Sequence, residues 1–472
     1  MFRECEIGLV GLGAMGRNLA LNLADHGFSV AVYNRTGERT REFIEKEAGG
    51  RSLWPAYSTP EFLKLLQKPR TIIILVAAGP PVDAVIRELL PHLKPGDLLI
   101  DGGNSHFIDT DRRARVLARK DVHLLGMGIS GGELGARHGP SLMPGGPRKE
   151  YDRVEPVLNE IAAKVNGEPC VAYMGTGSAG HYVKMVHNGI EYGLMQLVAE
   201  TYDMLKCGLG LGSEELAEIY TGWNQGELNS YLLEITADIF RRRDDRTGQP
   251  LIDLIMDVAK QKGTGKWASW DAMDLMVPTP TIDVAVAMRG LSRLKEERQV
   301  ASQLLPHPKP GFKTDRSGFV AKLRNALGAA SIVAYAQGLA QLREASRAYN
   351  YGINLESVAR VWRGGCIIRA ALLEDIRAAF RVRSDLPNLL LDPHLREQVL
   401  AREADWREVV KAAVDWGIPT PGFMVSLAYL DGYRRQWLPA NLIQAQRDYF
   451  GAHTYERRDA QGSFHTDWQK SK

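Results

Sequence analysis

The sequence predicts an α/β domain at the N-terminus, a large all-α domain after it, and an extended C-terminal tail. Short β-branched runs alternate with helical segments in the first part of the chain, which favours a parallel sheet with helices on both faces. From about Gly180 the segments are longer and have helical apolar spacing. From about Gln436 the chain is aromatic and polar without an obvious helical stripe, and its aromatic residues favour docking onto another surface over disorder.

The individual elements follow from the same patterns. Buried strands, each followed by a turn or helix signal, are predicted at Ile7–Val10, Ser29–Tyr33, Thr71–Val76 and Leu98–Asp101, with weaker candidates at Val122–Leu125 and Cys170–Tyr173. Long helical stretches are predicted at His181–Lys206, Ser213–Tyr220, Ser230–Arg241 and Ile282–Arg298. A small-residue linker at Gly175–Gly180 marks the first boundary, so the predicted domains are residues 1–178, 179–435 and 436–472.

A weak internal repeat lies within the helical part. The run Val183–Met185 aligns with Ala321–Leu323. The alternative is chance similarity between amphipathic helices. A true duplication would place Ala329 opposite Glu191, so that one copy would carry chemistry and the other only packing.

Composition limits the classes of function. The chain has 472 residues, 44% of them hydrophobic and 24% charged, and a formal net charge of +3, ordinary values for a soluble globular protein. So small a charge gives no support for nucleic acid or a membrane surface as a partner. The 4 cysteines are scattered without a metal-ligand spacing, so we expect no metal site and a reducing compartment. With no signal sequence and no apolar run of about 20 residues, the expected location is the cytoplasm.

The run Gly11-Leu12-Gly13-Ala14-Met15-Gly16 follows the first strand and begins a helix. In this strand–turn–helix context it is the dinucleotide fingerprint of a Rossmann-like domain. The first glycine permits a tight turn, the second lets the backbone approach a pyrophosphate, and the third allows close helix–strand packing. The helix N-terminus supplies free N–H groups to the phosphates. The alternative is that the glycines only shape a turn.

The end of the second strand indicates which dinucleotide binds. NAD enzymes usually have an acidic residue there, about 20 residues after the glycine motif, to bind the ribose 2′-hydroxyl. This chain has Asn34-Arg35-Thr36 instead. Arg35 offers a permanently charged donor fork that suits a phosphate, and Thr36 adds a hydroxyl. The sequence therefore predicts NADP as the cofactor.

Two loops are candidates for the substrate site: the first closes a strand at its carboxyl end, the side on which open parallel sheets bind ligands, and the second lies after the sheet, where loops carry function. One is Asp101–Ser105, which contains Asn104, and the other is Gly128–Gly132, which contains Ser130 and Gly131. Adjacent glycines leave backbone N–H groups accessible to a carboxylate or a nicotinamide. For the second loop, taken alone, a flexible turn is an equally good interpretation.

Four polar residues share one face of the helix that follows the linker. At about 100° per residue, Lys184, His187, Asn188 and Glu191 fall within about 100° of one another. An apolar stripe beside them would face the core. A solvated polar face is the usual interpretation of Lys and Glu alone, but an amine, an imidazole, an amide and a carboxylate on one face are less ordinary.

A further segment, Gln261–Trp267, superficially resembles a phosphate-binding loop. It lacks the full glycine-to-lysine spacing of a nucleotide P-loop, and Trp267 stands where a magnesium-binding hydroxyl would be. Lys262, the Thr264 hydroxyl and the open glycine backbone can still hold a simple phosphoester. Arg289 could complete such a pocket, although a lone arginine is more often a surface or structural residue.

Together these motifs resemble the 6-phosphogluconate dehydrogenase family. The resemblance extends from about Ile7 to Trp468, with the motifs in the family's order, and the tail segment Leu438–Tyr455 is highly specific to that family. It implies a Rossmann-like domain, a large all-helical domain with an internal duplication, and a tail that penetrates the partner subunit of a homodimer. Each active site would then borrow Arg447 and His453 from the neighbour.

The resemblance also implies the chemistry: oxidative decarboxylation of 6-phosphogluconate to ribulose 5-phosphate and CO2 with NADP, in the pentose phosphate pathway and gluconate utilization, without a metal. Lys184 would remove the proton of the substrate 3-hydroxyl while hydride leaves C3, and Glu191 would later protonate C1. The residues implied to orient the sugar acid are Asn104, Ser130, Gly131, Gly132, His187 and Asn188. Those implied to hold its phosphate are Tyr192, Lys262, Thr264, Arg289 and the neighbour's Arg447. The cofactor would also contact Val76, Ala77 and Asn104.

Three positions depart from the family pattern. Ala77 stands where the family often has a lysine near the cofactor, and Leu134 and Leu194 replace acidic residues common beside two motifs. None of these changes removes a catalytic group. Two alternatives remain: another β-hydroxyacid dehydrogenase that acts on an unphosphorylated acid, and a non-catalytic NADP-binding protein. Relatives of the first kind are shorter and usually lack the phosphate-binding residues and the tail, and a protein of the second kind would be expected to lose Lys184 or Glu191.

Overall fold

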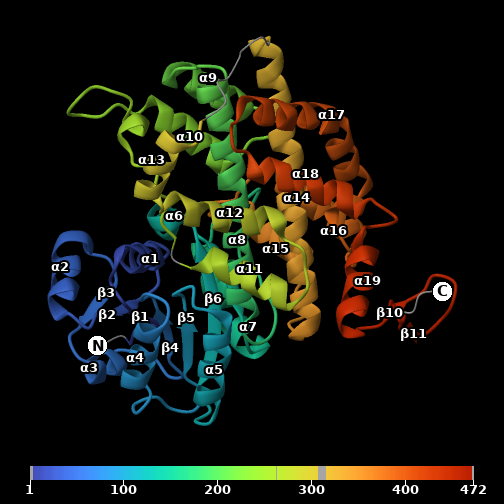
Figure 1. The fold of residues 1–472 in the computed structure, drawn as a ribbon. Coiled ribbons are helices and arrows are strands. Elements are labelled where there is room, and N and C mark those ends of the chain that lie inside the picture. The colour runs from blue at the N-terminus through green and yellow to red at the C-terminus, as the bar shows by residue number, and fades with distance from the viewer. Residues whose placement is uncertain (1–3, 262, 307–314, 470–472) are drawn as a thin grey trace. The chain divides into compact units, whose positions relative to one another are not determined.

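The computed structural model describes residues 4–261, 263–306 and 315–469. The chain divides into two compact units, Met1–Val425 and Ser426–Lys472. The first unit contains both a sheet with its covering helices, in blue to teal in Figure 1, and a large set of further helices. In the described part of the chain, no helix has the length and apolar character needed to cross a membrane.

A mainly parallel sheet forms the N-terminal part, as predicted. Its strands lie in the order β3-β2-β1-β4-β5-β6-β7; neighbours are parallel up to β6, and β6 pairs with β7 in the antiparallel sense. The order reverses between β1 and β4, and open sheets bind ligands in the crevice at the carboxyl ends of the strands at such a point. The strands are β1 (Ile7–Val10), β2 (Val30–Tyr33), β3 (Leu53–Ala56), β4 (Thr71–Ile74), β5 (Leu98–Asp101), β6 (His123–Ser130) and β7 (Ser141–Gly145).

The four main strand predictions are confirmed, apart from small differences at their ends, and the weaker candidate Val122–Leu125 begins the longer β6. The prediction of a strand at Cys170–Tyr173 is wrong, because only Val171 pairs there, in an isolated bridge to Leu142. β3 and β7 were not predicted. Each contains a proline, which in a sequence indicates a turn, but both lie at edges of the sheet, where proline is tolerated.

Side chains of the strands alternate between two faces, and each face has its own buried cluster. Leu9, Val32 and Ile100 belong to the cluster that α1, α2 and α7 cover, whereas Val10 and Ile74 belong to the one that α3, α4 and α5 cover. Burial on both faces explains the continuous apolar runs in the sequence. The covering helices are α1 (Ala14–Asp25), α2 (Gly37–Glu47), α3 (Thr59–Lys64), α4 (Pro80–Leu89), α5 (Phe107–Ala118), α6 (Gly132–His138) and α7 (Arg148–Ile161).

The helical part follows a short hairpin, β8 (Lys164–Val165) and β9 (Glu168–Pro169). The single helix predicted at Ile282–Arg298 is wrong in one respect, since α12 ends at Ser292 and α13 begins at Lys295. Lys295 pairs with Asp257 at 2.6 Å, so the start of α13 is held by a separate segment. The helices are α8 (Ala179–Asp203), a π-helical turn (Met204–Gly208), α9 (Ser213–Trp223), α10 (Tyr231–Arg241), a 3₁₀ turn (Leu251–Leu254), α11 (Thr264–Asp274), α12 (Pro280–Ser292), α13 (Lys295–Leu304), α14 (Arg316–Ala348), α15 (Leu355–Trp362), α16 (Leu372–Val382), a 3₁₀ turn (Leu389–Leu391), α17 (Pro393–Trp416) and α18 (Pro421–Tyr433).

The order of helices repeats, in agreement with the predicted duplication. A long helix is followed by two short helices that pack on each other: α8 by α9 and α10, and α14 by α15 and α16. α8 and α14 also pack against each other (Figure 1). Lys184 lies in the second turn of α8, and Lys322 lies in the second turn of α14.

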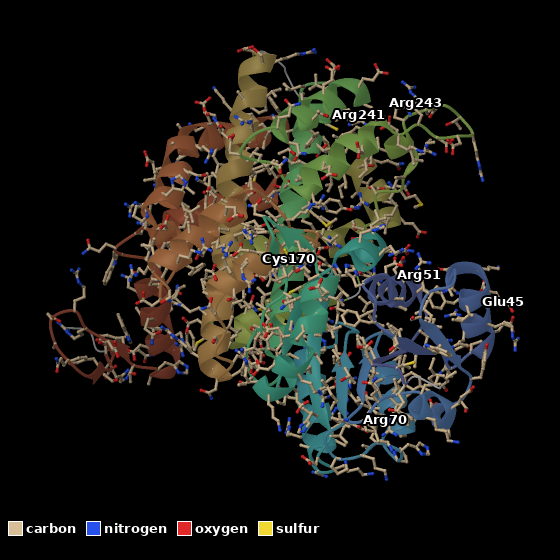
Figure 2. All side chains as sticks on the ribbon, turned by 180° about the vertical axis from the view of Figure 1, so that it is seen from behind. Glu45, Arg51, Arg70, Cys170, Arg241 and Arg243 are labelled. Atoms are coloured by element: carbon tan, nitrogen blue, oxygen red, sulfur yellow. The ribbon has the colours of Figure 1, made fainter. Side chains whose placement is uncertain are left out.

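A buried seam joins the sheet to the helical part. Cys170 lies in this seam, between the sheet and the helices that follow (Figure 2). The N–H of Ser141 donates to the Gly365 carbonyl at 2.8 Å, which connects β7 to the loop after α15. Arg363 and Arg377 each pair with Glu168 at 2.6 Å, so the β8–β9 hairpin is held against α15 and α16.

The second unit contains α19 (Ala440–Gly451) and the hairpin of β10 (Tyr455–Glu456) and β11 (Ser463–Phe464). The Asp448 carboxylate lies at its centre and accepts hydrogen bonds from the Thr466 N–H at 3.0 Å and Trp468 Nε1 at 2.8 Å. Burial by itself would raise the pKa of Asp448, but the hydrogen bonds outweigh it and hold the pKa below its ordinary value. Residues 440–451 form a helix although the sequence shows no helical stripe there. The stripe is missing because apolar side chains such as Phe450 are exposed and do not face a core.

Candidate active site

The glycine loop between β1 and α1 has the geometry of a phosphate-binding turn. Gly11 has a φ of +105°, and a Cβ there would collide with the Leu75 carbonyl. A Cβ on Gly16 would collide with the Gly11 carbonyl, whereas one on Gly13 would meet nothing within 4 Å. Gly13 precedes α1 and has no side chain to cover the first N–H groups of the helix. The loop therefore fits a pyrophosphate at the helix N-terminus.

A cavity opens at the carboxyl ends of β1, β2 and β4. Of the predicted cofactor residues, those that line it are Gly11, Gly13, Asn34, Arg35, Thr36, Val76 and Ala77. Ala14, Met15 and Gly16 form the first turn of α1, and Asn104 lies in the loop after β5. The helix α4 supplies the opposite wall through Pro80, Pro81, Ala84, Val85 and Glu88.

The loop after β2 provides the basic rim of this cavity. Asn34 fixes the loop, since its Oδ1 accepts from the Leu12 N–H and its Nδ2 donates to the Thr36 carbonyl, both at 3.1 Å. Arg35 and Thr36 are exposed at the rim, and Arg39, in the first turn of α2, lines the same cavity. Two guanidinium groups and a hydroxyl fit the 2′-phosphate of NADP. Arg39 was missed, although a basic residue in the helix that follows the second strand was the available signal.

Asn104 joins the two predicted substrate loops. Its φ of +51° turns the chain after β5. Its Oδ1 accepts from the Ile129 N–H at 3.0 Å, and its Nδ2 donates to the Ile129 carbonyl at 3.1 Å. The loop after β5 is thereby attached to β6 immediately before Ser130.

The four polar residues predicted to share a face of α8 do meet there. Lys184 Nζ donates to Ser130 Oγ at 3.0 Å and lies 3.2 Å from His187 Nδ1. His187 Nε2 is 3.3 Å from Ser130 Oγ, and Nδ1 is 3.1 Å from Asn188 Oδ1. Glu191 Oε2 is 3.6 Å from the same His187 Nδ1. Strand β6 and helix α8 thus build one connected polar cluster.

This cluster is buried, which changes how its groups titrate. Lys184 is 5% exposed and His187 0%. Burial lowers the pKa of Lys184, against the opposing effect of the Glu191 carboxylate. Burial, together with the charge of Lys184, holds the pKa of His187 well below its ordinary value. Burial raises the pKa of Glu191, against Lys184 and Arg289. The amine and the carboxyl group are therefore both shifted toward their neutral forms, which favours an exchange of protons with a ligand.

Close packing surrounds the cluster. A Cβ on Gly128 would collide with the Cβ of Lys184, so this glycine lets α8 approach the sheet. The Trp362 ring contacts the His187 ring edge-on, with centroids 5.7 Å apart. Cys366 is near enough to Lys184 for each to affect the other's pKa, and burial raises the pKa of the Cys366 thiol to about 12. Neither Trp362 nor Cys366 was predicted, because both come from the end of α15, far away in the sequence.

Gly131 and Gly132 lie beside the cluster at the start of α6. They have φ values of +113° and +62°. A Cβ on Gly131 would lie 2.5 Å from the Gly365 carbonyl oxygen, whereas one on Gly132 would meet nothing within 4 Å. Gly132 therefore leaves open space next to Ser130, as a loop that approaches a ligand requires.

The predicted phosphate-binding residues gather further along α8. The Arg289 guanidinium lies over the Tyr192 ring, 3.5 Å from its centroid. Asn188 Nδ2 donates to Thr264 Oγ1 at 2.9 Å. Lys262 lies outside the described residues. Tyr192, Thr264 and Arg289 thus lie close together beside Asn188 of the polar cluster.

The two predicted tail residues belong to the second unit. Arg447 is exposed on α19 and donates to Gln444 Oε1 at 3.1 Å. His453 is also exposed, with its ring edge-on to Phe450 and the centroids 5.9 Å apart. Both side chains are accessible to a second molecule.

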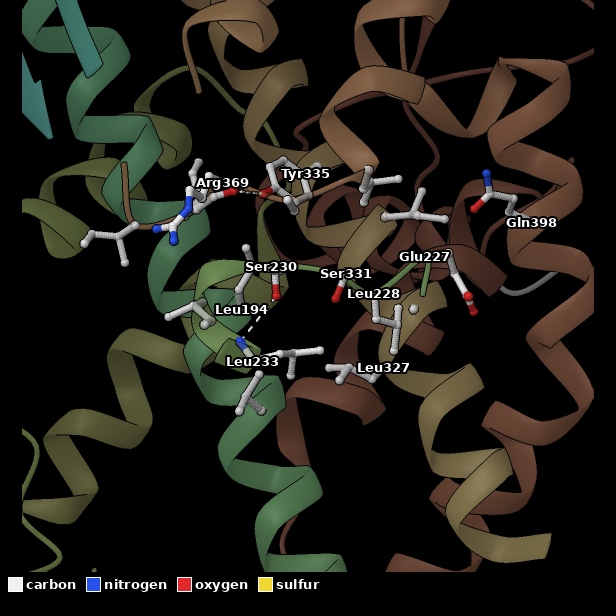
Figure 3. Close-up of a pocket in the computed structure, with 18 of the residues that line it drawn as sticks. Leu194, Glu227, Leu228, Ser230, Leu233, Leu327, Ser331, Tyr335, Arg369 and Gln398 are labelled. Atoms are coloured by element: carbon white, nitrogen blue, oxygen red, sulfur yellow. Dashed lines mark hydrogen bonds between the residues drawn. The ribbon is translucent and has the colours of Figure 1, made fainter. Parts of the chain in front are cut away.

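A separate apolar cavity lies one turn beyond Glu191 on α8 (Figure 3). Its lining includes Leu194, Leu233 and Leu327, and neither catalytic candidate of α8 contributes to it. Leu194, which replaces an acidic residue common in the resembled family, therefore adds apolar surface here. Among the described residues, no group of three or more His, Cys, Asp or Glu side chains is arranged to hold a metal ion.

Comparison with known proteins gives a consistent result. Residues 6–175 match the model described as the NAD binding domain of 6-phosphogluconate dehydrogenase, and residues 180–468 match that of the 6-phosphogluconate dehydrogenase C-terminal domain. The chain is 54% identical to "6-phosphogluconate dehydrogenase, decarboxylating" of Synechococcus elongatus, over 98% of this chain and 99% of that protein. It is 52% identical, with the same coverage, to the NADP(+)-dependent, decarboxylating 6-phosphogluconate dehydrogenase of Bacillus subtilis.

A solved structure is similar over the whole chain. It is the 6-phosphogluconate dehydrogenase of Plasmodium falciparum, described in its apo form, with its cofactor NADP+ and with its substrate 6-phosphogluconate. The TM-score is 0.95 at 44% identity, and the match covers 98% of this chain and 100% of that one.

Proposed function

Because this chain belongs to the 6-phosphogluconate dehydrogenase family, we propose that it converts 6-phosphogluconate to ribulose 5-phosphate and CO2, a step of the pentose phosphate pathway, with NADP as the oxidant. One observation carries this function: the loop that contains Asn104 connects the cluster of Lys184, His187 and Glu191 to a dinucleotide crevice with two arginines at its rim. An amine, an acid and an NADP site together suit an oxidation coupled to loss of CO2.

The first step requires a base for the substrate 3-hydroxyl. NADP held in the crevice by the glycine loop, Arg35 and Thr36 would supply the acceptor for the hydride of C3. Lys184 Nζ, positioned by Ser130 and His187, takes the hydroxyl proton. Because burial lowers the pKa of Lys184, a larger fraction of the amine is neutral near physiological pH and can act as a base.

The second step is loss of CO2 from the 3-keto acid, in which the C3 carbonyl receives the electron pair. Lys184, now protonated, donates to that oxygen and stabilises the enediol. Ser130 Oγ keeps Nζ in place. His187 stays neutral, since its pKa lies well below its ordinary value, so it adds no second positive charge beside the lysine.

The last step is protonation of the enediol at the carbon that lost CO2, which is C2 of the substrate and becomes C1 of ribulose 5-phosphate, and we assign this step to Glu191. Burial raises the pKa of this carboxyl group, so it retains a proton at a higher pH than an exposed glutamate does. Its position on the same face of α8 as Lys184, 3.6 Å from His187, supports this assignment.

The remaining residues bind and orient the sugar acid. Tyr192, Lys262, Thr264 and Arg289 hold the phosphate, and the charged fork of Arg289 suits phosphate oxygens. The residues that orient the carbon chain are Asn104, Ser130, Gly131, Gly132, His187 and Asn188.

The domain limits and the assembly also belong to this proposal. We divide the chain at 178/179 and 435/436, and the family-model limits at 175 and 180 support the first division. The enzyme acts as a homodimer in which Arg447 and His453 of one copy complete the site of the other, and the exposure of both side chains on the tail supports this. The unpaired cysteines support a reducing, cytoplasmic location.

The direct test is NADPH absorbance after purified protein, 6-phosphogluconate and NADP are mixed. We expect NADPH and CO2 in equal amounts, and a much slower reaction with NAD. Gluconate without the phosphate tests the rival β-hydroxyacid dehydrogenase, which would oxidise it at least as well. Binding of NADP without turnover of either acid would favour the non-catalytic alternative.

The shared site is tested by mixing two inactive variants, Lys184→Ala and Arg447→Ala. Subunits that exchange at random form heterodimers in half of the cases, and each heterodimer has one intact site. The mixture should therefore regain about a quarter of the wild-type activity. If the tail served its own subunit, no intact site would form and the mixture would stay inactive.

A further inference from the structure

Arg113 is a buried arginine of α5 that uses every donor it has. The residue is 2% exposed. Nε and Nη2 donate to the two carboxylate oxygens of Asp83 at 2.9 and 3.1 Å, and Nη2 also donates to the Gly79 carbonyl at 2.9 Å. Nη1 donates to Asp101 Oδ2 at 3.2 Å and Ser105 Oγ at 2.9 Å. The five N–H groups of the guanidinium are therefore all used, as its planar fork allows.

One side of this network belongs to the cofactor cavity. Gly79 and Asp83 flank the first turn of α4, and Pro80, Pro81 and Ala84 of that turn line the cavity. Arg113 hydrogen-bonds to this turn at the backbone of Gly79 and at the carboxylate of Asp83. The wall of the cofactor cavity is thus attached to α5.

The other side belongs to the substrate loop. Asp101 ends β5, and its Oδ1 accepts from the Gly103 N–H at 3.0 Å while its Oδ2 accepts from Ser105 Oγ at 2.7 Å. These bonds shape the turn that holds Asn104 at its positive φ. A Cβ on Gly103 would lie 2.7 Å from the Val76 carbonyl oxygen, so the same turn also packs on the cofactor cavity.

The substrate loop in turn leads to the catalytic cluster. Asn104 is bonded twice to the backbone of Ile129. The next residue, Ser130, accepts from Lys184 Nζ. A continuous set of hydrogen bonds and two peptide links, Asn104–Ser105 and Ile129–Ser130, therefore runs from Arg113 to the base.

We propose that Arg113 is a positioning residue for hydride transfer, which holds the α4 wall of the cofactor cavity and the Asn104 loop in one fixed relation. This inference rests on the proposed function, because it assumes that NADP and the sugar acid meet between these two elements. A displacement of about 1 Å in such an arrangement can slow a reaction by about a hundredfold.

The neighbouring Arg112 is a matched control. It also donates to Asp83, at 2.9 and 3.0 Å, but its side chain is 49% exposed and it donates otherwise to the surface residue Asp109, at 3.1 Å. Arg112→Lys therefore removes part of the Asp83 interaction without touching Asp101 or Ser105.

The experiment compares Arg113→Lys, Arg112→Lys and Ser105→Ala. The readouts are the KM for both ligands, the deuterium isotope effect on kcat with substrate labelled at C3, and the Kd of NADPH measured by its fluorescence. For Arg113→Lys we expect both KM values and the Kd to rise about tenfold and the isotope effect to increase, since hydride transfer becomes more limiting. Ser105→Ala keeps the charges of Arg113 and of its carboxylate partners, so it should change the same quantities less. Arg112→Lys should leave them within about twofold of the wild type.

The proposal is overturned if folded Arg113→Lys loses thermal stability but keeps wild-type KM, Kd and isotope effect, or if Arg112→Lys shows the same losses. If Arg113→Lys does not fold, Ser105→Ala decides, and wild-type constants in that variant overturn the proposal. Failure of the proposed function would look different, because the wild type itself would then not turn over 6-phosphogluconate. The Kd of NADPH would still report on Arg113 in that case.

Discussion

The helices α8 and α14 are similar at their starts but face different neighbours. Each has a lysine in its second turn, Lys184 and Lys322. Lys184 is buried against β6, where Gly128 leaves room for it. The Lys322 side chain is 39% exposed and pairs with Glu408 of α17 at 3.1 Å. The same residue in equivalent helices therefore lies in a buried site in one case and in a surface ion pair in the other.

The positions one and two turns later differ in the same way. His187 and Glu191 on α8 belong to the polar cluster around Lys184. Their counterparts on α14 are Asn325, which donates to Asp405 of α17 at 2.6 Å, and Ala329, which is fully buried. The comparison shows that the partner element decides the role of a helix. The glycine-containing strand β6 admits the lysine of α8 into a buried position, whereas α17 gives the lysine and the asparagine of α14 an ion-pair and a hydrogen-bond partner.

The largest expected effect separates the two lysines. Lys184→Ala should lower kcat by about a thousandfold, because it removes the general base, and such groups contribute about 10²–10⁴. Lys322→Ala should leave kcat nearly unchanged, since an exposed ion pair contributes at most about 1 kcal/mol to stability. Steady-state kinetics of both variants, with circular dichroism to verify folding, makes the comparison. Equal losses in the two variants would contradict it.

The next effect concerns the acid. Glu191→Gln should lower kcat by about a hundredfold with little change in KM, because the amide cannot give a proton to C1. The reciprocal change, Ala329→Glu, should instead lower the melting temperature, since it buries an unpaired carboxyl group at a cost of several kcal/mol. Kinetics and thermal unfolding of both variants test this pair. A fully active Glu191→Gln enzyme would remove the acid from the mechanism.

A smaller effect is expected from Glu200, near the end of α8, where the duplication aligns Gly338 of α14. Glu200 accepts from the N–H groups of Gly422 and Phe423 at 2.7 and 2.9 Å, and burial raises its pKa from 4.5 to about 7. Because the pKa is higher in the folded state than in the unfolded state, protonation of Glu200 stabilises the folded protein. This stabilisation is fully present below pH 4.5 and is lost as the pH rises to about 7.

The amide of Glu200→Gln does not titrate, so the variant should lose less unfolding free energy than the wild type as the pH rises. The wild type should lose up to about 1.4 kcal/mol per pH unit more than the variant within that window. Urea unfolding of both proteins at several pH values measures the difference. Parallel curves for the two proteins would show that Glu200 does not titrate there.

Sequence patterns were sufficient where the geometry is local. The roles of Gly11, Gly13 and Gly16 depend on backbone conformation and on distances within one strand–turn–helix unit, so the motif predicts them. The shared face of Lys184 and Glu191 follows from helical periodicity alone. The predicted sheet and helical domain rest on the same two kinds of signal.

What the sequence could not reveal depends on contacts between distant segments. Trp362 and Cys366 reach the α8 cluster from more than a hundred residues away, and no pattern connects them to Lys184. Arg113 resembles any helical arginine until its five acceptors are seen together. The helix α19 was missed because its exposed apolar side chains give no stripe toward its own core.

Chemical rescue of Lys184→Ala tests the central claim, that the buried amine of α8 is the base. Methylamine and ethylamine are small enough to enter the space left by the lysine side chain, and NADPH formation is measured against the concentration of free amine at fixed 6-phosphogluconate and NADP. We expect the rate of Lys184→Ala to rise with the neutral amine, while the wild type and Lys322→Ala do not respond. Wild-type activity in Lys184→Ala without any amine, or the same response in all three proteins, would contradict the claim.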